Sequence, residues 1–242
     1  MKLNLKNKNI LLTGGTRGIG KNIRDQLIEH GAKVIITGTK SRDNYKLPSE
    51  LYDYIMLDTT SPKTINNFFM RVEKIKSIDV LINNMGVNKI NNLKMINDFE
   101  FDHILNTNLK FPFQLCRLIS KKMIKKKQGR ILNISSIWSI VSKPKRLSYA
   151  TSKSAINGLT RTLAAELGKY NILVNSISPG ITNTELTKKN LGNEINSIRK
   201  EIPLNRIAET KEIGSVAVFL CSSLNTYITG QNIVVDGGFT IK

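Results

Sequence analysis

The stretch Asn9-Ile10-Leu11-Leu12-Thr13-Gly14-Gly15-Thr16-Arg17-Gly18-Ile19-Gly20 decides the fold of this chain. Its first part reads as a buried strand, because an unbroken apolar run is closed by two glycines. Ile19, Ile23 and Leu27 then recur at every fourth position, which predicts a helix that ends at Gly31. A strand, a glycine-rich turn and a helix in this order are typical of a dinucleotide-binding unit.

The glycine-rich turn has the shape that a pyrophosphate needs. The spacing between Gly14 and Gly18 lets the backbone turn tightly, and Gly20 lets the helix pack close to the strand. The first N–H groups of the helix then face the anion with the positive end of the helix dipole. The candidate cofactor-binding residues in this turn are Gly14, Thr16, Arg17, Gly18, Ile19 and Gly20.

The rest of the chain alternates short β-rich runs with helical patterns. Further strands are predicted at 33–37, 54–57, 80–83, 130–134, 172–177 and 232–235. Helices are predicted at 62–76, at 99–126, from the segment around Tyr149 to Leu167, and at 209–220. This alternation is typical of an α/β fold, in which a doubly wound parallel sheet carries helices on both faces. Ligands of such sheets bind outside the carboxyl ends of the strands, at the topological switch point.

Length and composition favour a single domain over residues 1–242. The chain has 242 residues, 40% of them hydrophobic, and no linker, low-complexity run or long repeat divides it. The N-terminus lacks the apolar segment of a signal peptide, and no apolar run approaches the ~18 residues of a membrane span. Cys116 and Cys221 lack the spacing of metal ligands. We therefore expect a cytoplasmic protein with two reduced, packed thiols, no bound metal and no membrane contact.

The formal net charge of +19 has two interpretations. It can reflect a composition rich in lysine, or it can attract an anionic partner such as a nucleic acid, an acidic protein or a phosphorylated ligand. The basic residues are mostly scattered, except for the cluster Lys121, Lys122, Lys125, Lys126 and Lys127. That cluster lies at a predicted helix C-terminus, where the helix dipole favours cations. No nucleic-acid-binding module is recognisable, so we expect no specific nucleic-acid partner.

The end of the second strand bears on the choice of dinucleotide. NAD-binding proteins of this type carry an acidic residue there, which accepts a hydrogen bond from the ribose 2′-hydroxyl. This chain reads Thr37-Gly38-Thr39-Lys40-Ser41-Arg42 instead. Arg17, Lys40 and Arg42 could face a 2′-phosphate and Thr39 could hydrogen-bond to it, although a basic protein also has ordinary basic loops. The pattern favours NADP(H) over NAD(H).

Polar residues and glycines follow the other strands. Asp58 could accept from an adenine amino group or cap the next turn, and Asn84 could hold an irregular turn in which Gly86 leaves room for the ribose. After the sixth strand come Pro179 and Gly180, then hydroxyl groups suited to nicotinamide amide and phosphate, on Thr182 and Thr184.

Tyr149 and Lys153 are four residues apart, so on a helix they share one face. An ammonium beside a phenol favours the phenolate and lowers its pKa, and such a pair can move a proton while a hydride moves at the neighbouring carbon. Many helices pair tyrosine with lysine only on their surface. Ser136, at the end of the fifth strand, could orient a substrate carbonyl or simply form a turn. Asn108, in the middle of a predicted helix, could kink it and hold a water near Lys153, or be an exposed asparagine.

Together these residues resemble the short-chain dehydrogenase/reductase family over almost the whole chain, from Thr13 to Gly238. The resemblance rests on the glycine-rich turn, Asn83-Asn84-Met85-Gly86, Asn108, Ser136, Tyr149, Lys153 and Pro179-Gly180. It implies a seven-stranded Rossmann-type sheet, a homotetramer and a substrate lid at about 183–205. It also implies a catalytic tetrad. Tyr149 would be the acid/base, Lys153 would lower its pKa and bind the nicotinamide ribose, Ser136 would orient the carbonyl, and Asn108 would hold a proton-relay water. Met85 replaces the usual alanine, which we expect to narrow the space near the cofactor.

Within this family the chain is most similar to the 3-oxoacyl-(acyl-carrier-protein) reductases, in the turn, the segment 125–130 and the tail 227–231. The resemblance implies an acyl-thioester substrate and an acidic carrier protein that docks near Lys127. A second docking cation is replaced by Tyr170, beside Lys169. The lid segment is polar, so a sugar-derived or other small polar ketone, as in surface-polysaccharide synthesis, is the alternative substrate. A non-catalytic dinucleotide sensor is disfavoured, because both Tyr149 and Lys153 are present.

Overall fold

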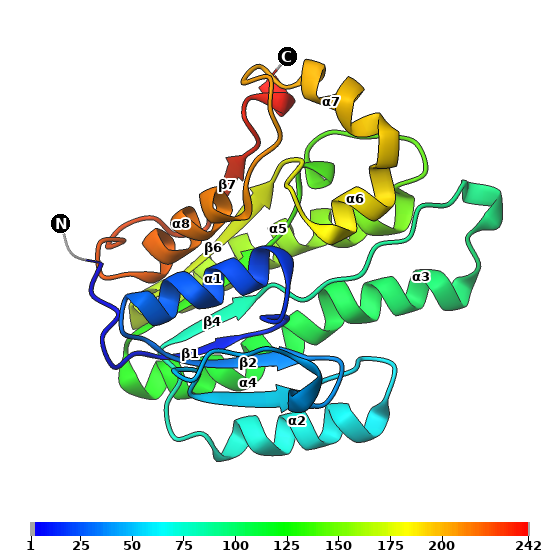
Figure 1. Ribbon diagram of the computed structural model, residues 1–242. Helices are drawn as coiled ribbons and strands as arrows, with labels where there is room; N and C mark the ends of the chain where they lie inside the picture. Colours follow the sequence, from blue (N-terminus) through cyan, green and yellow to red (C-terminus); the bar gives the residue numbers. More distant parts are fainter. Residues whose placement is uncertain (1–2, 242) are drawn as a thin grey trace.

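The computed structural model describes residues 3–241, which form a seven-stranded sheet flanked by helices on both faces (Figure 1). The strand order is β3-β2-β1-β4-β5-β6-β7, and each neighbouring pair is parallel. The strands are β1 (Asn9–Leu12), β2 (Lys33–Gly38), β3 (Asp53–Met56), β4 (Val80–Asn83), β5 (Gly129–Ile134), β6 (Ile172–Pro179) and β7 (Asn232–Val235). The winding changes direction between β1 and β4, which is the topological switch point. The predicted doubly wound parallel sheet is confirmed.

Helices cover the sheet in two layers. The helices are α1 (Gly18–Glu29), α2 (Pro62–Lys74), α3 (Asp98–Leu105), α4 (Phe111–Lys126), α5 (Leu147–Leu167), α6 (Glu185–Leu191), α7 (Ile195–Glu201) and α8 (Thr210–Cys221). Helices α1 and α8 pack on one face, and α2, α4 and α5 on the other. Helices α6 and α7 lie over the carboxyl end of β6, away from the main layers (Figure 1).

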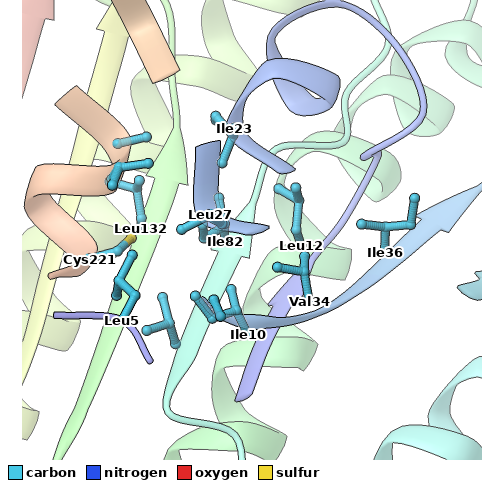
Figure 2. Close-up of a cluster of buried hydrophobic side chains, with 14 of the residues drawn as sticks. Leu5, Ile10, Leu12, Ile23, Leu27, Val34, Ile36, Ile82, Leu132 and Cys221 are labelled. Carbon is cyan, nitrogen blue, oxygen red and sulfur yellow. The ribbon is translucent and has the colours of Figure 1, made fainter. Parts of the chain in front are cut away.

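The central strands are apolar on both sides because each side packs against helices. Ile10 and Leu12 of β1 enter the core beneath α1 and α8, which Figure 2 shows, whereas Leu11 between them enters the opposite core. Ile82 and Leu81 of β4 divide in the same way. Successive residues of a strand face opposite sides of the sheet, and here both sides are apolar. The strands therefore read as continuous apolar runs in the sequence.

Three aromatic rings hold the second face together. Phe68 of α2 lies 5.5 Å from both Phe69 and Phe111, measured between ring centroids, and Phe68 is fully buried. Phe111 opens α4, so this cluster joins α2 to α4 on the same face of the sheet.

The predicted helix over 99–126 is interrupted in the structure. Helix α3 ends at Leu105, and the π-helical turn η3 (Asn106–Lys110) carries the chain into α4. The amide of Asn108 supplies the local cause, because it bonds to the backbone of Val87 instead of leaving the helix undisturbed. The sequence pattern located the unusual asparagine correctly but not the bulge.

Two short helices in the lid segment were not predicted. Thr184 caps α6 by accepting a hydrogen bond from the backbone N–H of Thr187 at 3.1 Å, and Gly192 ends that helix at a positive φ of 46°. The segment is polar overall, but Leu191, Ile198 and Ile202 are buried against Ile137 and Ile181. These apolar residues are therefore turned toward the body of the protein, whereas Leu186 and Leu204 of the same segment are exposed.

Both cysteines are free and buried, and burial raises the pKa of each thiol to about 12. Neither thiol is therefore reactive at neutral pH. Across the described part of the chain, residues 3–241, every helix is too short or too polar to cross a bilayer.

Replacing Phe68 with alanine should lower the free energy of unfolding by about 3–5 kcal/mol, because the cavity would lie between two packed rings. Urea titration monitored by circular dichroism measures this change. Met70 on the same helix is 57% exposed, so Met70→Ala should change stability by less than about 0.5 kcal/mol. Equal effects of the two substitutions would contradict the packing described for α2.

Candidate active site

A cavity of about 540 Å³ lies at the carboxyl ends of the central strands. Most of the residues singled out in the sequence border it. They are Gly14, Thr16, Arg17, Gly18, Ile19, Gly20, Thr39, Lys40, Asp58, Asn84, Gly86, Ser136, Tyr149, Lys153, Pro179, Gly180, Thr182 and Thr184. Two do not border it: Arg42 is exposed in a short 3-10 turn, and Asn108 is buried behind the cavity wall.

Asn84 locks the glycine-rich turn onto the switch point. Its side-chain N–H groups donate to the carbonyl oxygens of Thr13 (3.0 Å) and Gly14 (2.9 Å). Gly14 has a φ of +71°, and a Cβ on Gly20 would lie 2.0 Å from the carbonyl oxygen of Gly14. Only glycine fits at these two positions. From the other side, the buried Arg24 donates to the carbonyl oxygen of Gly15 at 3.1 Å.

The end of β2 presents hydroxyl and amine groups to the cavity and no carboxylate. Thr39 and Lys40 border the cavity, and the Tyr45 hydroxyl accepts from the backbone N–H of Lys40 at 3.2 Å. Burial raises the pKa of Tyr45, but hydrogen bonds from Thr39, Lys40 and Thr16 outweigh it, and the net pKa is lowered. A Cβ on Gly38 would lie 2.6 Å from Thr16, so the strand must end in glycine for the turn to approach it.

Asp58, Thr182 and Thr184 already have partners within the protein. One carboxylate oxygen of Asp58 accepts from the N–H (2.9 Å) and the hydroxyl (2.7 Å) of Thr60, which is the turn-capping role considered above. The hydroxyl of Thr182 donates to the carbonyl oxygen of Gly180 at 3.0 Å, and Thr184 caps α6 beside Gly18. Each still borders the cavity.

Tyr149, Lys153 and Ser136 converge at the floor of the cavity. The Lys153 ammonium lies 5.6 Å from the centroid of the Tyr149 ring, and it donates to the carbonyl oxygen of Ile134 at 2.7 Å. Ser136 hydrogen-bonds to Tyr149 and also accepts from the backbone N–H of Trp138 at 3.3 Å. The hydroxyl of Ser135 donates to the carbonyl oxygen of Lys153 at 3.1 Å, which fixes the helix against β5.

Burial dominates the electrostatics of this group. Desolvation lowers the pKa of Lys153 to about 8. Desolvation also raises the pKa of Tyr149, while the hydrogen bond from Ser136 and the charge of Arg146 lower it. The sequence predicted that Lys153 lowers the pKa of Tyr149. In the structure the net direction is upward, because desolvation of the phenol outweighs the hydrogen bond from Ser136 and the charge of Arg146.

Asn108 supports the site from behind. Its carbonyl oxygen accepts from the N–H of Val87 (2.8 Å), and its amide donates to the Val87 carbonyl (2.9 Å) and the Ser152 hydroxyl (3.0 Å). A Cβ on Gly86 would lie 3.3 Å from the Asn108 oxygen and 3.4 Å from the Lys153 nitrogen. Gly86, which also borders the cavity, therefore packs beside both groups, and any proton relay from Lys153 through Asn108 would have to pass it.

Some side chains that line the cavity were not singled out in the sequence. Tyr45, Trp138 and Arg146 all border it. Arg146 stands three residues before Tyr149 and caps α5, so its proximity to the phenol could have been inferred from spacing. Tyr45 and Trp138 lie in irregular segments whose direction the sequence does not reveal.

The basic cluster of α4 lies at the other end of the sheet. Lys127 ends α4 in a left-handed conformation (φ 51°), just before the amino end of β5, whereas the cavity lies at the carboxyl ends. Lys126 forms an ion pair with Asp79, and Lys122 donates to the carbonyl oxygens of Glu73 and Ile75. Part of the cluster thus fastens α4 to the loop before β4.

The cavity suits a dinucleotide. A glycine-lined turn meets the start of α1 at one end, and a buried amine, a phenol and a serine hydroxyl meet at the other. The amide oxygen of Asn88, in the wall of the cavity, is buried without a hydrogen-bond partner among the described residues. A helix start that can bind an anion and a separate group of a phenol, an amine and a hydroxyl, both in one cavity, match a nicotinamide dinucleotide.

Comparison with known proteins agrees with this geometry. The family model described as enoyl-(acyl carrier protein) reductase matches residues 14–240. The 3-oxoacyl-(acyl-carrier-protein) reductase FabG of Aquifex aeolicus (strain VF5) is 35% identical over 247 residues, covering 98% of this chain and 99% of the relative. A solved structure described as a short chain dehydrogenase/reductase family protein superposes with a TM-score of 0.89 at 28% identity, covering 99% of this chain and 100% of the other.

A gluconate 5-dehydrogenase from Burkholderia cenocepacia J2315, solved in complex with NADP and tartrate, has a TM-score of 0.88 at 26% identity. The match covers 100% of this chain and 98% of that one. Sequence and fold similarity therefore extend over almost the whole chain. The chain belongs to the short-chain dehydrogenase/reductase family, whose members are oxidoreductases that act on CH–OH and C=O groups with NAD(P).

Proposed function

We propose that this protein is an NADP(H)-dependent carbonyl reductase of the 3-oxoacyl reductase type. The observation that carries the proposal is the meeting of Tyr149, Lys153 and Ser136 at one end of a cavity whose other end is the glycine-rich turn. When bound, the reduced nicotinamide supplies the hydride that reaches the carbonyl carbon. The side chains of this site would then supply the proton and hold the substrate.

Each side chain has a distinct role in this proposal. Ser136 orients the carbonyl oxygen toward the phenol, and Tyr149 donates the proton that turns that oxygen into a hydroxyl. Lys153 stabilises the phenolate that remains and binds the nicotinamide ribose. Asn108 fixes the backbone beside Lys153, from which a water could return the proton to Tyr149. The raised pKa of Tyr149 keeps the phenol protonated and ready to donate at neutral pH.

NADP(H) is proposed over NAD(H) on the composition of the β2 end. Arg17, Thr39 and Lys40 border the cavity there, and the β2 end lacks an acidic residue to meet the ribose 2′-hydroxyl. Arg42, also predicted to face the phosphate, lies outside the cavity wall in this structure. The B. cenocepacia gluconate 5-dehydrogenase is described with NADP bound, which supports the same preference.

The physiological substrate has two candidates. The similarity to 3-oxoacyl reductases favours a 3-oxoacyl thioester delivered by an acidic carrier protein, with Lys127 as the docking residue. The similarity to a gluconate 5-dehydrogenase, and the polar lid over 183–205, favour a small polar ketone. Trp138, Ile181, Leu186 and Leu191 give the lid side of the cavity an apolar component that either substrate would contact.

Assembly and location follow from the family as further proposals. We propose a cytoplasmic homotetramer formed by single-domain subunits, with 183–205 as the substrate lid of each. A carrier protein bound at Lys127 would lie at the end of the sheet opposite to the cavity of the same subunit. Carrier docking at that residue therefore fits delivery to the cavity of a neighbouring subunit better than delivery to its own.

Replacing Tyr149 with phenylalanine should lower kcat for ketone reduction by about 10²–10⁴-fold, because the proton donor is lost. The dissociation constant for NADPH should change little. Absorbance at the NADPH band measures turnover with 3-oxoacyl thioesters and sugar ketones, and fluorescence titration measures binding. Tyr227 is 93% exposed, so Tyr227→Phe is the matched control. Retention of most activity by Tyr149→Phe would remove the proposed role.

The rate of ketone reduction should fall as the pH rises through about 8, because Lys153 carries its charge below its pKa and loses it above. A pH profile of kcat under saturating NADPH tests this. Lys153→Arg should move the descending limb to higher pH, since a guanidinium stays charged. A profile that rises through pH 8 in the native enzyme would contradict the assignment.

Replacing Thr39 with aspartate should weaken NADPH binding by at least about 10-fold, because the carboxylate would repel a 2′-phosphate and accept from a 2′-hydroxyl. NADH binding should strengthen in the same variant. Fluorescence titration of both cofactors gives the ratio of the dissociation constants for NADPH and NADH. Asn44→Asp introduces the same charge in the exposed 3-10 turn outside the cavity and should leave that ratio unchanged. A native protein that prefers NADH would refute the cofactor proposal.

A further inference from the structure

The substrate end of the cavity contains a cation that the proposed chemistry does not use. Arg146 borders the cavity and is only 5% exposed. Its guanidinium lies over the ring of Trp138, 5.7 Å from the centroid, and its charge acts on Tyr149. Among the described side chains and the backbone carbonyls of residues 3–241, no group forms a hydrogen bond or an ion pair with this guanidinium.

This placement is costly without an anion. A guanidinium has five N–H donors, and burying a charge without a partner is strongly unfavourable. Arg146 is also the N-cap of α5, where the helix dipole repels a cation, and the first turn of α5 contains no acidic residue. Desolvation accordingly lowers the pKa of Arg146. Packing on Trp138 offsets part of this cost, but it satisfies no N–H group.

Beside the Tyr149 phenol, the group whose charge acts on Arg146 is the carboxylate of Glu194. It interacts with the guanidinium only through long-range charge, and its ion pair is with Lys143, at 3.5 Å. The Glu194 side chain is 65% exposed, so solvent screens its effect. Glu194 lies in the lid, between α6 and α7, which makes a lid latch the rival explanation for Arg146.

The geometry points to a substrate carboxylate as the partner of Arg146. We propose that the reductase acts on oxo acids, whose carboxylate binds Arg146 while the ketone is presented to Tyr149. Because Arg146 and Tyr149 border the same cavity and the charge of Arg146 acts on the phenol, we expect the carboxylate within a few bonds of the reacting carbonyl. A planar carboxylate can accept two hydrogen bonds from one guanidinium, which a thioester or an ester cannot do. This inference rests on the proposed reductase function, and it selects among its substrates.

Matched substrate pairs test the inference. The pairs are 2-, 3- and 4-oxo acids of four to six carbons and their methyl esters, each assayed with NADPH. For the native enzyme, kcat/KM should be higher for the acid of at least one pair. Arg146→Gln should lower kcat/KM for that acid by about 100-fold, and for its ester by less than about 3-fold. Arg146→Lys keeps the charge but loses the paired donors. Its kcat/KM for the acid should therefore lie between those of the native enzyme and Arg146→Gln.

Two variants separate this role from its rivals. Lys145→Gln removes a neighbouring exposed cation and should leave the acid-to-ester ratio unchanged. Glu194→Gln removes the alternative partner and should leave the ratio unchanged or raise it. If Glu194→Gln reproduces the loss seen in Arg146→Gln, Arg146 is a lid latch. If Arg146→Gln lowers acid and ester equally, Arg146 positions Tyr149. Either result overturns the inference.

A binding measurement keeps the inference testable without turnover. Trp138 is the single tryptophan of the chain, and Arg146 lies over its ring. Titrating the oxo acids into the NADP⁺-saturated protein should therefore change the tryptophan fluorescence saturably, and the esters should not. The change should be absent in Arg146→Gln. If no ketone is reduced but the acids still bind in this way, the proposed function fails and the anion site stands. If the acids bind no better than the esters, the anion site fails alone.

Discussion

The whole site depends on the two hydrogen bonds from the side-chain amide of Asn84 to the carbonyl oxygens of Thr13 and Gly14. They join the ends of β1 and β4, the two strands between which the winding of the sheet reverses. Without them the Gly14 carbonyl would be an unpaired group at the edge of a cavity. The same oxygen occupies the space where a side chain on residue 20 would lie. Asn84 and Gly20 therefore form one constraint, which sets the distance between the first helix and the sheet.

Much of the fold could be predicted because the strand residues that face either side of the sheet are apolar. Ile10 and Leu11 are both apolar although they point in opposite directions, which happens only when helices cover both faces. The bulge at Asn106–Lys110 could not be predicted, since it depends on Val87, a residue distant in sequence that binds Asn108. The lid helices were missed for a similar reason. Their few apolar side chains, such as Leu191 and Ile198, become meaningful only when Trp138 and Ile181 lie beneath them.

Some features of the candidate site could likewise be predicted from the sequence, and others could not. Residues placed by strand ends, such as Ser136 and Gly180, could be predicted because parallel strands bring their carboxyl ends to one edge. The pairing of Tyr149 with Lys153 followed from helical spacing. The direction of their pKa shifts did not, because it depends on how dry the site is and on which acceptor the ammonium has. Desolvation of the phenol raises the pKa of Tyr149 despite Ser136 and Arg146, and the buried Lys153 donates to the carbonyl oxygen of Ile134. The sequence therefore indicates which side chains lie together, but not how far they are desolvated.

Burial also distinguishes the cations that matter from the rest of the +19 charge. Most lysines of this chain are exposed, where solvent and salt reduce their influence on any partner. Arg24, Lys153 and Arg146 are each at least nine-tenths buried, and each lies along the line from the glycine-rich turn to the lid. Arg24 is bound to the Gly15 carbonyl and to Asp25, and Lys153 to the Ile134 carbonyl. Arg146 alone among these three has its charge facing the cavity without such an acceptor. Because a buried cation is costly without hydrogen-bond acceptors, the proposed substrate carboxylate would supply acceptors for the N–H groups of Arg146.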